Sequence, residues 1–312
     1  MSDEKPLTSV IVVNRDGGIH LQKCLLTLHK QDSRKGLEIL LVDNASSDGS
    51  YERAEEMYPD LRIVRSETNL GYAGGANLGA KHAKGNLLVF VNNDVEFDND
   101  WLGNLITAAG QEGRRSIIGS KVLLKDHPGA LNHFGGLITY LGSGFDVAMG
   151  EPDRNASSIF LTGYASGAAL MIPRELFDEL GGFEESHFLY CEDVDLCWRA
   201  WLLGYRVVVQ PKAILYHSLQ SATSKSTSRL RFFHWHKNAI SNVMRNSGTK
   251  MLFYALGLHL ILHLARVASA IYLFSVWRIT TLFEADFWIL KNMPSMVRKR
   301  KEIQATRRVD DK

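Results

Sequence analysis

Residues 38–50, EILLVDNASSDGS, combine an apolar run with the polar turn that follows it. Ile39 to Val42 are all aliphatic, which is typical of a short buried strand. The polar half supplies Asp, Asn, Ser and Gly, the residue types that form turns and cap helices. We therefore expect a β-strand over 38–42, a polar loop at its carboxyl end, and then a helix over 51–58.

The same pattern recurs on both sides of this segment. Short apolar runs at 9–13 (SVIVV), 61–64 (LRIV) and 87–91 (LLVFV) are expected to be strands. Strands that alternate with helices predict an α/β fold with a mostly parallel, doubly wound, Rossmann-like sheet. Ligands of such sheets bind beyond the carboxyl ends of the strands. Polar clusters follow the runs at 9–13, 38–42 and 87–91, so we expect a binding site there.

Residues 69–77, NLGYAGGAN, form a glycine-rich stretch. We expect a loop that opens a helix, and the composition is similar to that of a phosphate-binding loop. The stretch lacks the GxGxxG spacing of dinucleotide-binding loops, so its composition alone assigns it no ligand.

Composition excludes several classes of protein. With 45% hydrophobic and 22% charged residues, the chain is not generally disordered. Its three cysteines form no CxxC pair, which favours a reducing compartment. Residues 1–7 lack the cationic and apolar regions of a signal peptide, and no GxxxxGKS/T motif indicates an NTPase. We therefore expect a globular region that stays in the cytosol.

The chain divides into three parts by composition. Residues 1–225 are expected to form an α/β domain, residues 226–290 a helical, apolar, membrane-associated region, and residues 291–312 a basic tail. The most apolar stretch, 251–283, predicts either a pair of amphipathic helices on a membrane or one transmembrane span. A central Arg266 would cost about 2.5–3.5 kcal/mol on insertion, which favours the first. The basic residues beside this stretch favour an anionic membrane surface, not nucleic acid, as the partner.

Two groups of side chains have the chemistry of an active site. Residues 92–94 (Asn-Asn-Asp) follow a strand directly, and the aspartate either holds Mg²⁺ or Mn²⁺ against a diphosphate or belongs to a solvated turn. Glu192, Asp193 and Asp195 either crowd together, which raises a pKa and suits a general base, or form the exposed acidic start of a helix. Spacing alone leaves these alternatives open, and it does not decide whether His217 is a metal ligand or a structural histidine.

Taken in order, five segments resemble the inverting family-2 glycosyltransferases of the GT-A fold, and especially their bacterial rhamnosyltransferase-like branch. The resemblance covers most of the chain, from residue 9 to about residue 221, and implies that residues 1–225 are a GT-A catalytic domain. The segments are SVIVVN (9–14), EILLVDNASSDGS (38–50), NLGYAGGANLG (69–79), LVFVNNDV (88–95) and the stretch from TGYASG to AILYH (162–217).

The resemblance implies a role for each matching residue. Asp193 is expected to be the general base, Asp94 the carboxylate of a DxD-type metal motif, and His217 a further metal ligand. Asn92 stands where that motif often has aspartate, so fewer carboxylates would hold the metal. The implied donor-binding residues are Val13, Asn14, Arg15, Asp43, Gly71, Asn77 and Asn93. The candidates on the acceptor side are Gly167, Glu192 and Trp198, although Trp198 is equally suited to core packing.

The implied function is transfer of a sugar, with inversion, from a dTDP- or UDP-linked donor to a hydroxyl of a lipid-linked or cell-envelope glycan. Rhamnose is the first sugar to test, and Mg²⁺ or Mn²⁺ is the expected cofactor. The expected location is the cytoplasmic face of the cell membrane, and a homo-oligomer is left open. The alternative is a non-catalytic, membrane-docked protein of the same fold. A nucleotidyltransferase would need a basic loop after the first strand, where only Arg15 is available.

Overall fold

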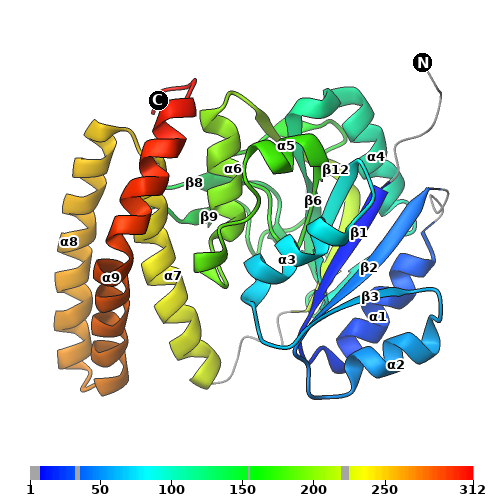
Figure 1. Cartoon of the computed structure of the whole chain (residues 1–312), viewed down its shortest axis with the longest axis horizontal. Coiled ribbons are helices and arrows are strands. Elements are labelled where there is room, and N and C mark those ends of the chain that lie inside the picture. The colour runs from blue at the N-terminus through cyan, green and yellow to red at the C-terminus, as the bar shows by residue number, and fades with distance from the viewer. Residues whose placement is uncertain (1–7, 32–35, 154, 219–224, 312) are drawn as a thin grey trace.

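The computed structural model describes residues 8–31, 36–153, 155–218 and 225–311. A sheet with helices on both faces forms the larger, amino-terminal part, and three long helices stand side by side at one end of it (Figure 1). The α/β class and the C-terminal helical region predicted from the sequence are confirmed.

The bounds of the elements follow the predicted pattern closely in the first hundred residues. The strands are β1 (Thr8–Asn14), β2 (Leu37–Asn44), β3 (Arg62–Ser66), β4 (Leu87–Asn92), β5 (Val95–Phe97), β6 (Ser116–Leu124), β7 (Leu131–His133), β8 (Gly136–Ile138), β9 (Gly144–Asp146), β10 (Phe160–Leu161), β11 (Ala169–Pro173) and β12 (Arg206–His217). The helices are α1 (Gly18–His29), α2 (Ser50–Met57), α3 (Gly71–His82), α4 (Trp101–Glu112), α5 (Arg174–Glu179), α6 (Glu192–Leu202), α7 (Lys225–Asn246), α8 (Thr249–Tyr272) and α9 (Val276–Thr306).

Among the described residues, ten strands form the main sheet. Its order is β10-β12-β6-β11-β4-β1-β2-β3, with β5 paired to β12 and β7 to β6. The neighbours from β3 to β4 pair in parallel, as do β6 and β12. β11 runs antiparallel to both of its neighbours. The doubly wound sheet expected from the sequence is parallel, so this reversal was not predicted. β11 is buried along its whole length, and a continuous apolar run does not indicate in which direction a strand runs.

Two apolar clusters hold the helices against the two faces of this sheet. Successive residues of β1 point to opposite faces, so that Val10 and Val12 join one cluster while Ile11 and Val13 join the other. α1 and α4 cover the first face, and α3, α5 and α6 cover the second. The carboxyl ends of β1, β2 and β4 therefore open toward loops, as the sequence predicts.

The glycine-rich stretch at 69–77 lies mostly inside α3, which corrects the expectation of a loop. α3 begins at Gly71, and its glycines let the helix approach the sheet closely. A Cβ added at Gly79 would lie 2.3 Å from Ile11 Cγ2, and one at Gly75 would lie 2.8 Å from Val13 Cγ1. These glycines thus allow α3 to pack closely on the sheet. Composition alone does not distinguish this packing role from that of a phosphate-binding loop.

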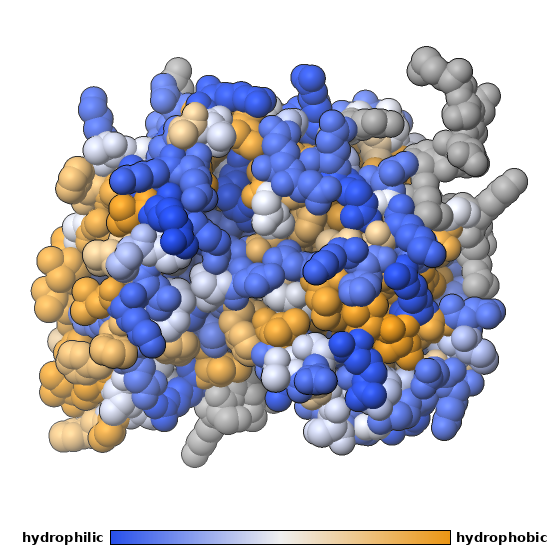
Figure 2. Space-filling model, in the orientation of Figure 1, coloured by the Kyte–Doolittle hydropathy of each residue, from blue (hydrophilic) through white to orange (hydrophobic). Residues whose placement is uncertain are grey.

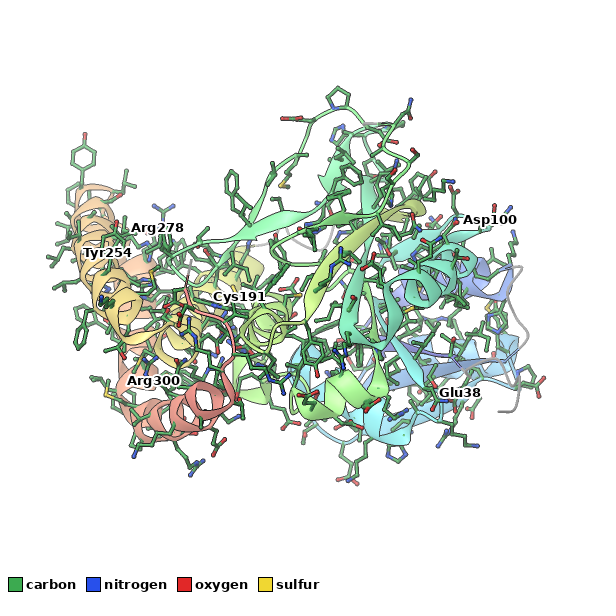
Figure 3. The ribbon with its side chains drawn as sticks, turned by 90° about the horizontal axis from the view of Figure 1, so that it is seen from above. Glu38, Asp100, Cys191, Tyr254, Arg278 and Arg300 are labelled. Carbon is green, nitrogen blue, oxygen red and sulfur yellow. The ribbon has the colours of Figure 1, made fainter. Side chains whose placement is uncertain are left out.

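The C-terminal helices form a bundle beside the catalytic domain. Seen from above, Tyr254 of α8 and Arg278 and Arg300 of α9 lie at one end, with Cys191 between them and the sheet (Figure 3). α9 continues to Thr306 through Pro294, so the boundary predicted at 290/291 falls inside one helix, and most of the expected basic tail is helical. By length and composition, α8 is the one described helix that could cross a membrane.

Candidate active site

A cleft of about 280 Å³ opens at the amino end of α6. It is lined by the end of β4, by β9, by the residues before β11, by the loop that leads into α6, by the end of β12 and by α7. Of the predicted site residues, the cleft brings together Gly167, Glu192, Asp193 and His217. Segments far apart in the sequence thus converge at this point.

Asp193 lies in the first turn of α6, where two backbone N–H groups hold its carboxylate. Gly167 donates to Oδ2 and Val194 to Oδ1, each at 2.8 Å. Burial raises the pKa of Asp193, although these two hydrogen bonds act in the opposite direction. Burial also raises the pKa of the adjacent Glu192 to about 8, and the charge of Asp193 adds to the effect. A carboxylate with a raised pKa, fixed at both oxygens and facing a cleft, is suited to accept a proton.

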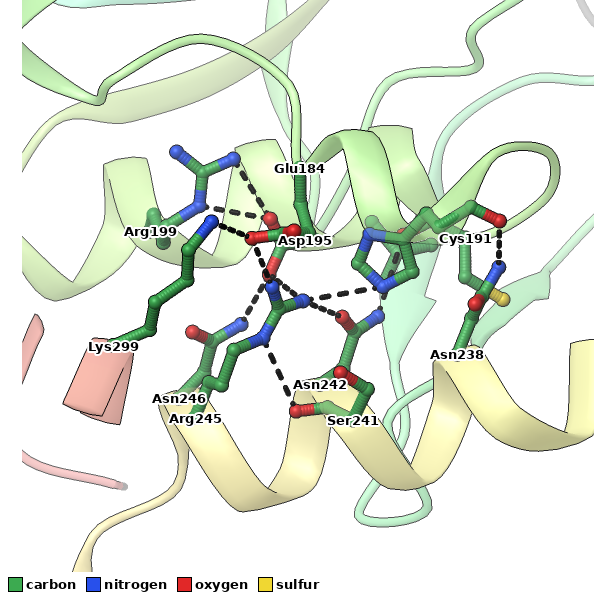
Figure 4. A network of polar contacts seen from close by, with 12 residues as sticks. Glu184, Cys191, Asp195, Arg199, Asn238, Ser241, Asn242, Arg245, Asn246 and Lys299 are labelled. Atoms are coloured by element: carbon green, nitrogen blue, oxygen red, sulfur yellow. Dashed lines mark hydrogen bonds and ion pairs between the residues drawn. The ribbon is translucent and has the colours of Figure 1, made fainter. Parts of the chain in front are cut away.

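Asp195 belongs to a different environment from its two neighbours. Its carboxylate is fully buried and forms ion pairs with Arg199 at 2.7 Å and Arg245 at 3.1 Å, and Asn246 donates to it at 2.9 Å (Figure 4). The charge of Arg199, followed by that of Arg245, overcomes the cost of burial and holds its pKa well below the usual range. The crowded group seen in the sequence therefore divides into a cleft pair, Glu192 and Asp193, and a structural aspartate.

Asp94 and His217 face each other at the ends of two strands. His217 Nε2 lies 3.2 Å from Asp94 Oδ1, and its Nδ1 lies 2.8 Å from Asn132 Oδ1. Nδ1–H donates to Asn132, so either a proton or a metal ion must separate the Nε2 lone pair from the carboxylate. An imidazole oriented through its other nitrogen, next to a carboxylate, is a common metal-binding arrangement. These residues therefore fit a divalent ion.

Asp43 is a second unusual carboxylate, at the end of β2. Its side chain is fully buried, and neither oxygen has a hydrogen-bond partner among the described residues. The nearest cation, Arg65, has its Nε 3.8 Å away and also stacks on Tyr51. A buried carboxylate without hydrogen bonds is costly, so this position is suited to a ligand that donates an N–H group, as a nucleobase does.

Other predicted donor-site residues are engaged in holding strand ends together. Asn14 donates to Ser46 and Ser50 and accepts from Asn93 at 2.8 Å, so it ties the loops after β1, β2 and β4. Val13 is buried on the sheet. Arg15 is exposed at the mouth of these loops, with Nε 3.7 Å from Asp16.

Gly71 and Asn77 both contact the segment that follows α5. Gly71 has φ +70°, and a Cβ there would lie 2.2 Å from the carbonyl oxygen of Phe188. Asn77 pairs with the backbone N–H and carbonyl of Phe183, each at 2.9 Å. Both residues thus position the loop that leads to Asp193. Trp198 does not reach the cleft, because it lines a separate cavity together with Trp201 and Met251.

The cleft also contains side chains that the sequence analysis did not select. Tyr164 donates to Asp146, which also pairs with His133 at 2.6 Å. Arg231 and Trp235 of α7 complete the lining. Tyr164 lies in a segment that the sequence analysis quotes, but Asp146 belongs to a three-residue strand with no recognisable pattern. Nothing in the sequence placed α7 at the cleft.

A second histidine–carboxylate group lies in the helical bundle. His236, His263 and Asp286 come from α7, α8 and α9, and their ligand atoms lie within 4.8 Å of one another. Arg266 contacts His236 Nδ1 at 2.8 Å. Because arginine only donates, His236 must carry its proton on Nε2, the nitrogen that faces Asp286. In this arrangement His236 therefore has no lone pair free for a metal ion, and the group ties α7, α8 and α9 together through polar contacts.

The sheet, the buried carboxylate at the end of β2 and the carboxylate–imidazole pair just beyond β4 fit a nucleotide-sugar-dependent glycosyltransferase of the GT-A fold. The chain belongs to glycosyl transferase family 2, whose model matches residues 9–181, more than half of its length.

Curated relatives agree with this assignment, and solved structures share the fold. An N-acetylglucosaminyl-diphospho-decaprenol L-rhamnosyltransferase of Mycobacterium tuberculosis is 29% identical over 259 residues, which cover 75% of this chain and 82% of that protein. The O-antigen biosynthesis protein RfbC of Myxococcus xanthus is 29% identical over 74% of this chain but only 18% of its own length. A mannosyltransferase from Pyrobaculum calidifontis, solved with GDP-Man and Mn²⁺, shares the fold with a TM-score of 0.56 at 19% identity, covering 97% of this chain and 86% of its own. GalNAc-T7, solved with UDP, GalNAc and Mn²⁺, has a TM-score of 0.65 at 17% identity, over 81% of this chain and 50% of its own.

Proposed function

We propose that this glycosyltransferase moves a sugar, with inversion, from a UDP- or dTDP-linked donor to a hydroxyl of a lipid-linked or cell-envelope glycan. Rhamnose is the sugar to test first, because the mycobacterial relative is named a rhamnosyltransferase for a lipid-linked acceptor. One arrangement carries the proposal: Asp193 and the histidine of the Asp94–His217 pair line the same cleft.

Asp193 is the general base in this proposal. Its two oxygens are fixed by Gly167 and Val194, so a carboxylate lone pair can point to the acceptor hydroxyl. Asp193 takes the hydroxyl proton while the oxygen attacks the anomeric carbon from the face opposite the nucleoside diphosphate. No nucleophilic side chain is needed, because a single displacement inverts the configuration.

Asp94 and His217 would hold Mg²⁺ or Mn²⁺. When bound, the ion supplies positive charge that stabilises the departing diphosphate. Asp43 accepts an N–H of the nucleobase, which relieves the cost of its buried, unpaired oxygens.

We also place residues 226–290, together with the basic segment 291–312, on an anionic membrane at its cytoplasmic face. A lipid-linked acceptor would be presented there, and the exposed apolar residues of α8 and α9 supply a surface that suits lipid.

The donor site is tested by thermal shift with UDP, dTDP, GDP and ATP, each with and without Mn²⁺. A ligand at 100 times its Kd stabilises by about 2.7 kcal/mol, enough to raise Tm by several degrees. We expect a metal-dependent rise with one pyrimidine diphosphate in the wild type, and its loss in Asp94→Ala. No rise with any nucleotide would favour the non-catalytic alternative.

The base is tested by Asp193→Asn in a transfer assay. We expect turnover to fall by about 10²–10⁴-fold while the metal-dependent nucleotide shift persists, because the amide cannot accept the proton. Glu192→Gln is the matched control for replacing a carboxyl group by an amide at the adjacent residue. Turnover retained in Asp193→Asn would remove Asp193 from the mechanism.

A further inference from the structure

Two side chains of α7 extend the cleft beyond the GT-A domain. Arg231 and Trp235 are four residues apart, so they share one face of the helix, and both line the cleft together with Asp193. Arg231 is exposed, and Trp235 is 37% exposed. Both side chains are therefore accessible to a molecule that enters the cleft.

Arg231 carries a positive charge in a cleft whose other charged side chains are acidic. The other charged side chains of the lining are carboxylates, those of Asp146, Glu192 and Asp193. Among the described residues of the lining, Arg231 alone carries a permanent positive charge, and no described acidic residue forms an ion pair with it. A guanidinium without a carboxylate partner presents its paired donors to an anion, and the fork matches phosphate geometry.

Arg231 also adjoins the most apolar surface of the molecule. The next residue, Phe232, packs edge-to-face on Trp277 at a ring distance of 6.0 Å, and Trp277 follows the turn between α8 and α9. Tyr272, Leu273, Phe274 and Val276 around this turn are exposed, with Phe274 at 93%. Arg231 therefore lines the cleft on the stretch of α7 where the adjacent Phe232 contacts an apolar tip formed by residues 272–277.

The carboxylate of Asp193, the guanidinium of Arg231 and the apolar tip suit, in turn, the sugar, the diphosphate and the lipid of an acceptor in which a diphosphate joins a sugar to a lipid. We propose that Arg231 binds that diphosphate, so that the sugar hydroxyl reaches Asp193 while the lipid lies against the apolar tip. The inference rests on the proposed function and adds the class of acceptor. The donor also carries a diphosphate, for which Asp94 and His217 would hold the metal ion. Because His217 lines the same cleft as Arg231, nucleotide affinity is the measurement that separates the two diphosphates.

The test compares Arg231→Gln with the wild type in binding experiments that need no sugar. The probes are farnesyl diphosphate, farnesol, and dTDP or UDP with Mn²⁺, all in the same detergent solution. Arg229→Gln is the matched control, because Arg229 lies on the same helix but pairs with Glu284 of α9. We expect the wild type to prefer farnesyl diphosphate to farnesol, and Arg231→Gln to raise the Kd of farnesyl diphosphate about tenfold or more while leaving nucleotide affinity unchanged.

Two results would overturn the inference. Equal binding of farnesyl diphosphate and farnesol by the wild type would show that no phosphate site exists on the acceptor side. A loss of nucleotide affinity in Arg231→Gln as large as the loss for farnesyl diphosphate would assign Arg231 to the donor. A wild type that binds no nucleoside diphosphate would refute the proposed function separately, while the comparison of farnesyl diphosphate with farnesol would still decide the role of Arg231.

Discussion

Glu192 and Asp193 are adjacent carboxylic acids at the start of α6, and their environments oppose full ionisation. Glu192 is 6% exposed, and its Oε2 has no hydrogen-bond partner among the described residues. Ionising both groups would place two negative charges side by side in a buried site, so the pair retains a proton near neutral pH. Asp193 has the two N–H donors, which makes it the member better able to carry the charge.

This pair makes stability depend on pH. The pKa of Glu192 is raised from 4.5 to about 8, so the folded state keeps a proton that the unfolded chain loses. Stability therefore falls as pH rises from about 4.5 to about 8. Glu192→Gln cannot ionise, so we expect its Tm to exceed that of the wild type by several degrees at pH 9 and by much less at pH 5, as measured by calorimetry.

The exposed Glu175 offers a control for this experiment, since Glu175→Gln removes a carboxylate outside the cleft. A Tm difference between Glu192→Gln and wild type that stays constant from pH 5 to pH 9 would contradict the raised pKa.

For single residues, the sequence predicted which side chains lie at strand ends better than it predicted what surrounds them. Asp43 and Asp94 were placed at strand ends because polar residues follow apolar runs there. The packing role of Asn77 was not predictable, because its partner Phe183 is 106 residues away in the chain. The separation of Asp195 from Asp193 likewise depends on Arg245, which comes from α7.

The loop that leads into α6 is held by α7. Phe188, Tyr190 and Cys191 all have positive φ, between +62° and +69°, a region that costs energy for residues other than glycine. Asn238 Nδ2 donates to the carbonyls of His187, Leu189 and Tyr190 at 2.7–3.0 Å. One buried side chain thus binds three carbonyl groups of a strained loop that ends just before the proposed base.

Replacing this side chain should affect catalysis more than folding. Asn238→Ala leaves buried carbonyls unpaired, at a cost of about 1–3 kcal/mol, and lets the loop relax. We expect kcat to fall by about tenfold or more because Asp193 loses its position, while far-UV circular dichroism stays native. A steady-state assay measures the change.

Asn292→Ala is a suitable control for Asn238→Ala, because Asn292 donates only to a carbonyl of its own helix. An unchanged kcat in Asn238→Ala, with a lowered Tm, would mean that the contact serves stability alone.

The contribution of α7 to the site was not predictable from the sequence. Residues 226–246 are helical in pattern, but periodicity does not tell which domain a helix packs against. Strands and helices before residue 100 were predicted well, because each contains its own apolar run and its own turn. β7, β8 and β9, of three residues each, are too short to show alternation.

At the scale of the molecule, an apolar surface covers one end. Exposed aromatic and aliphatic side chains of α8 and α9 gather there, seen as orange atoms over the helical bundle at the left of Figure 2. Only 11% of the most apolar window of α8 is buried. A patch of this kind on a soluble domain indicates a membrane or protein contact.

The contacts of α8 bear on whether it crosses a membrane or lies on one. Arg266 points toward His236 of α7, so its charge does not face lipid and no longer argues against insertion. However, His259 Nε2, near the middle of α8, contacts the carbonyl of Leu141 in the catalytic domain at 3.0 Å. A span centred there would bring polar loops of that domain into the hydrocarbon layer, which favours an interfacial helix pair.

An interfacial hairpin should be released from membranes without detergent. We expect alkaline carbonate or high salt to strip the protein from a membrane fraction, and flotation with phosphatidylglycerol vesicles to exceed flotation with phosphatidylcholine vesicles. Phe274→Glu puts a charge at the apolar tip and should reduce flotation, whereas Met57→Glu changes an exposed apolar residue of α2 and should not. Retention through carbonate until detergent is added would instead make α8 a transmembrane span, because only a helix inserted in the hydrocarbon layer resists that treatment.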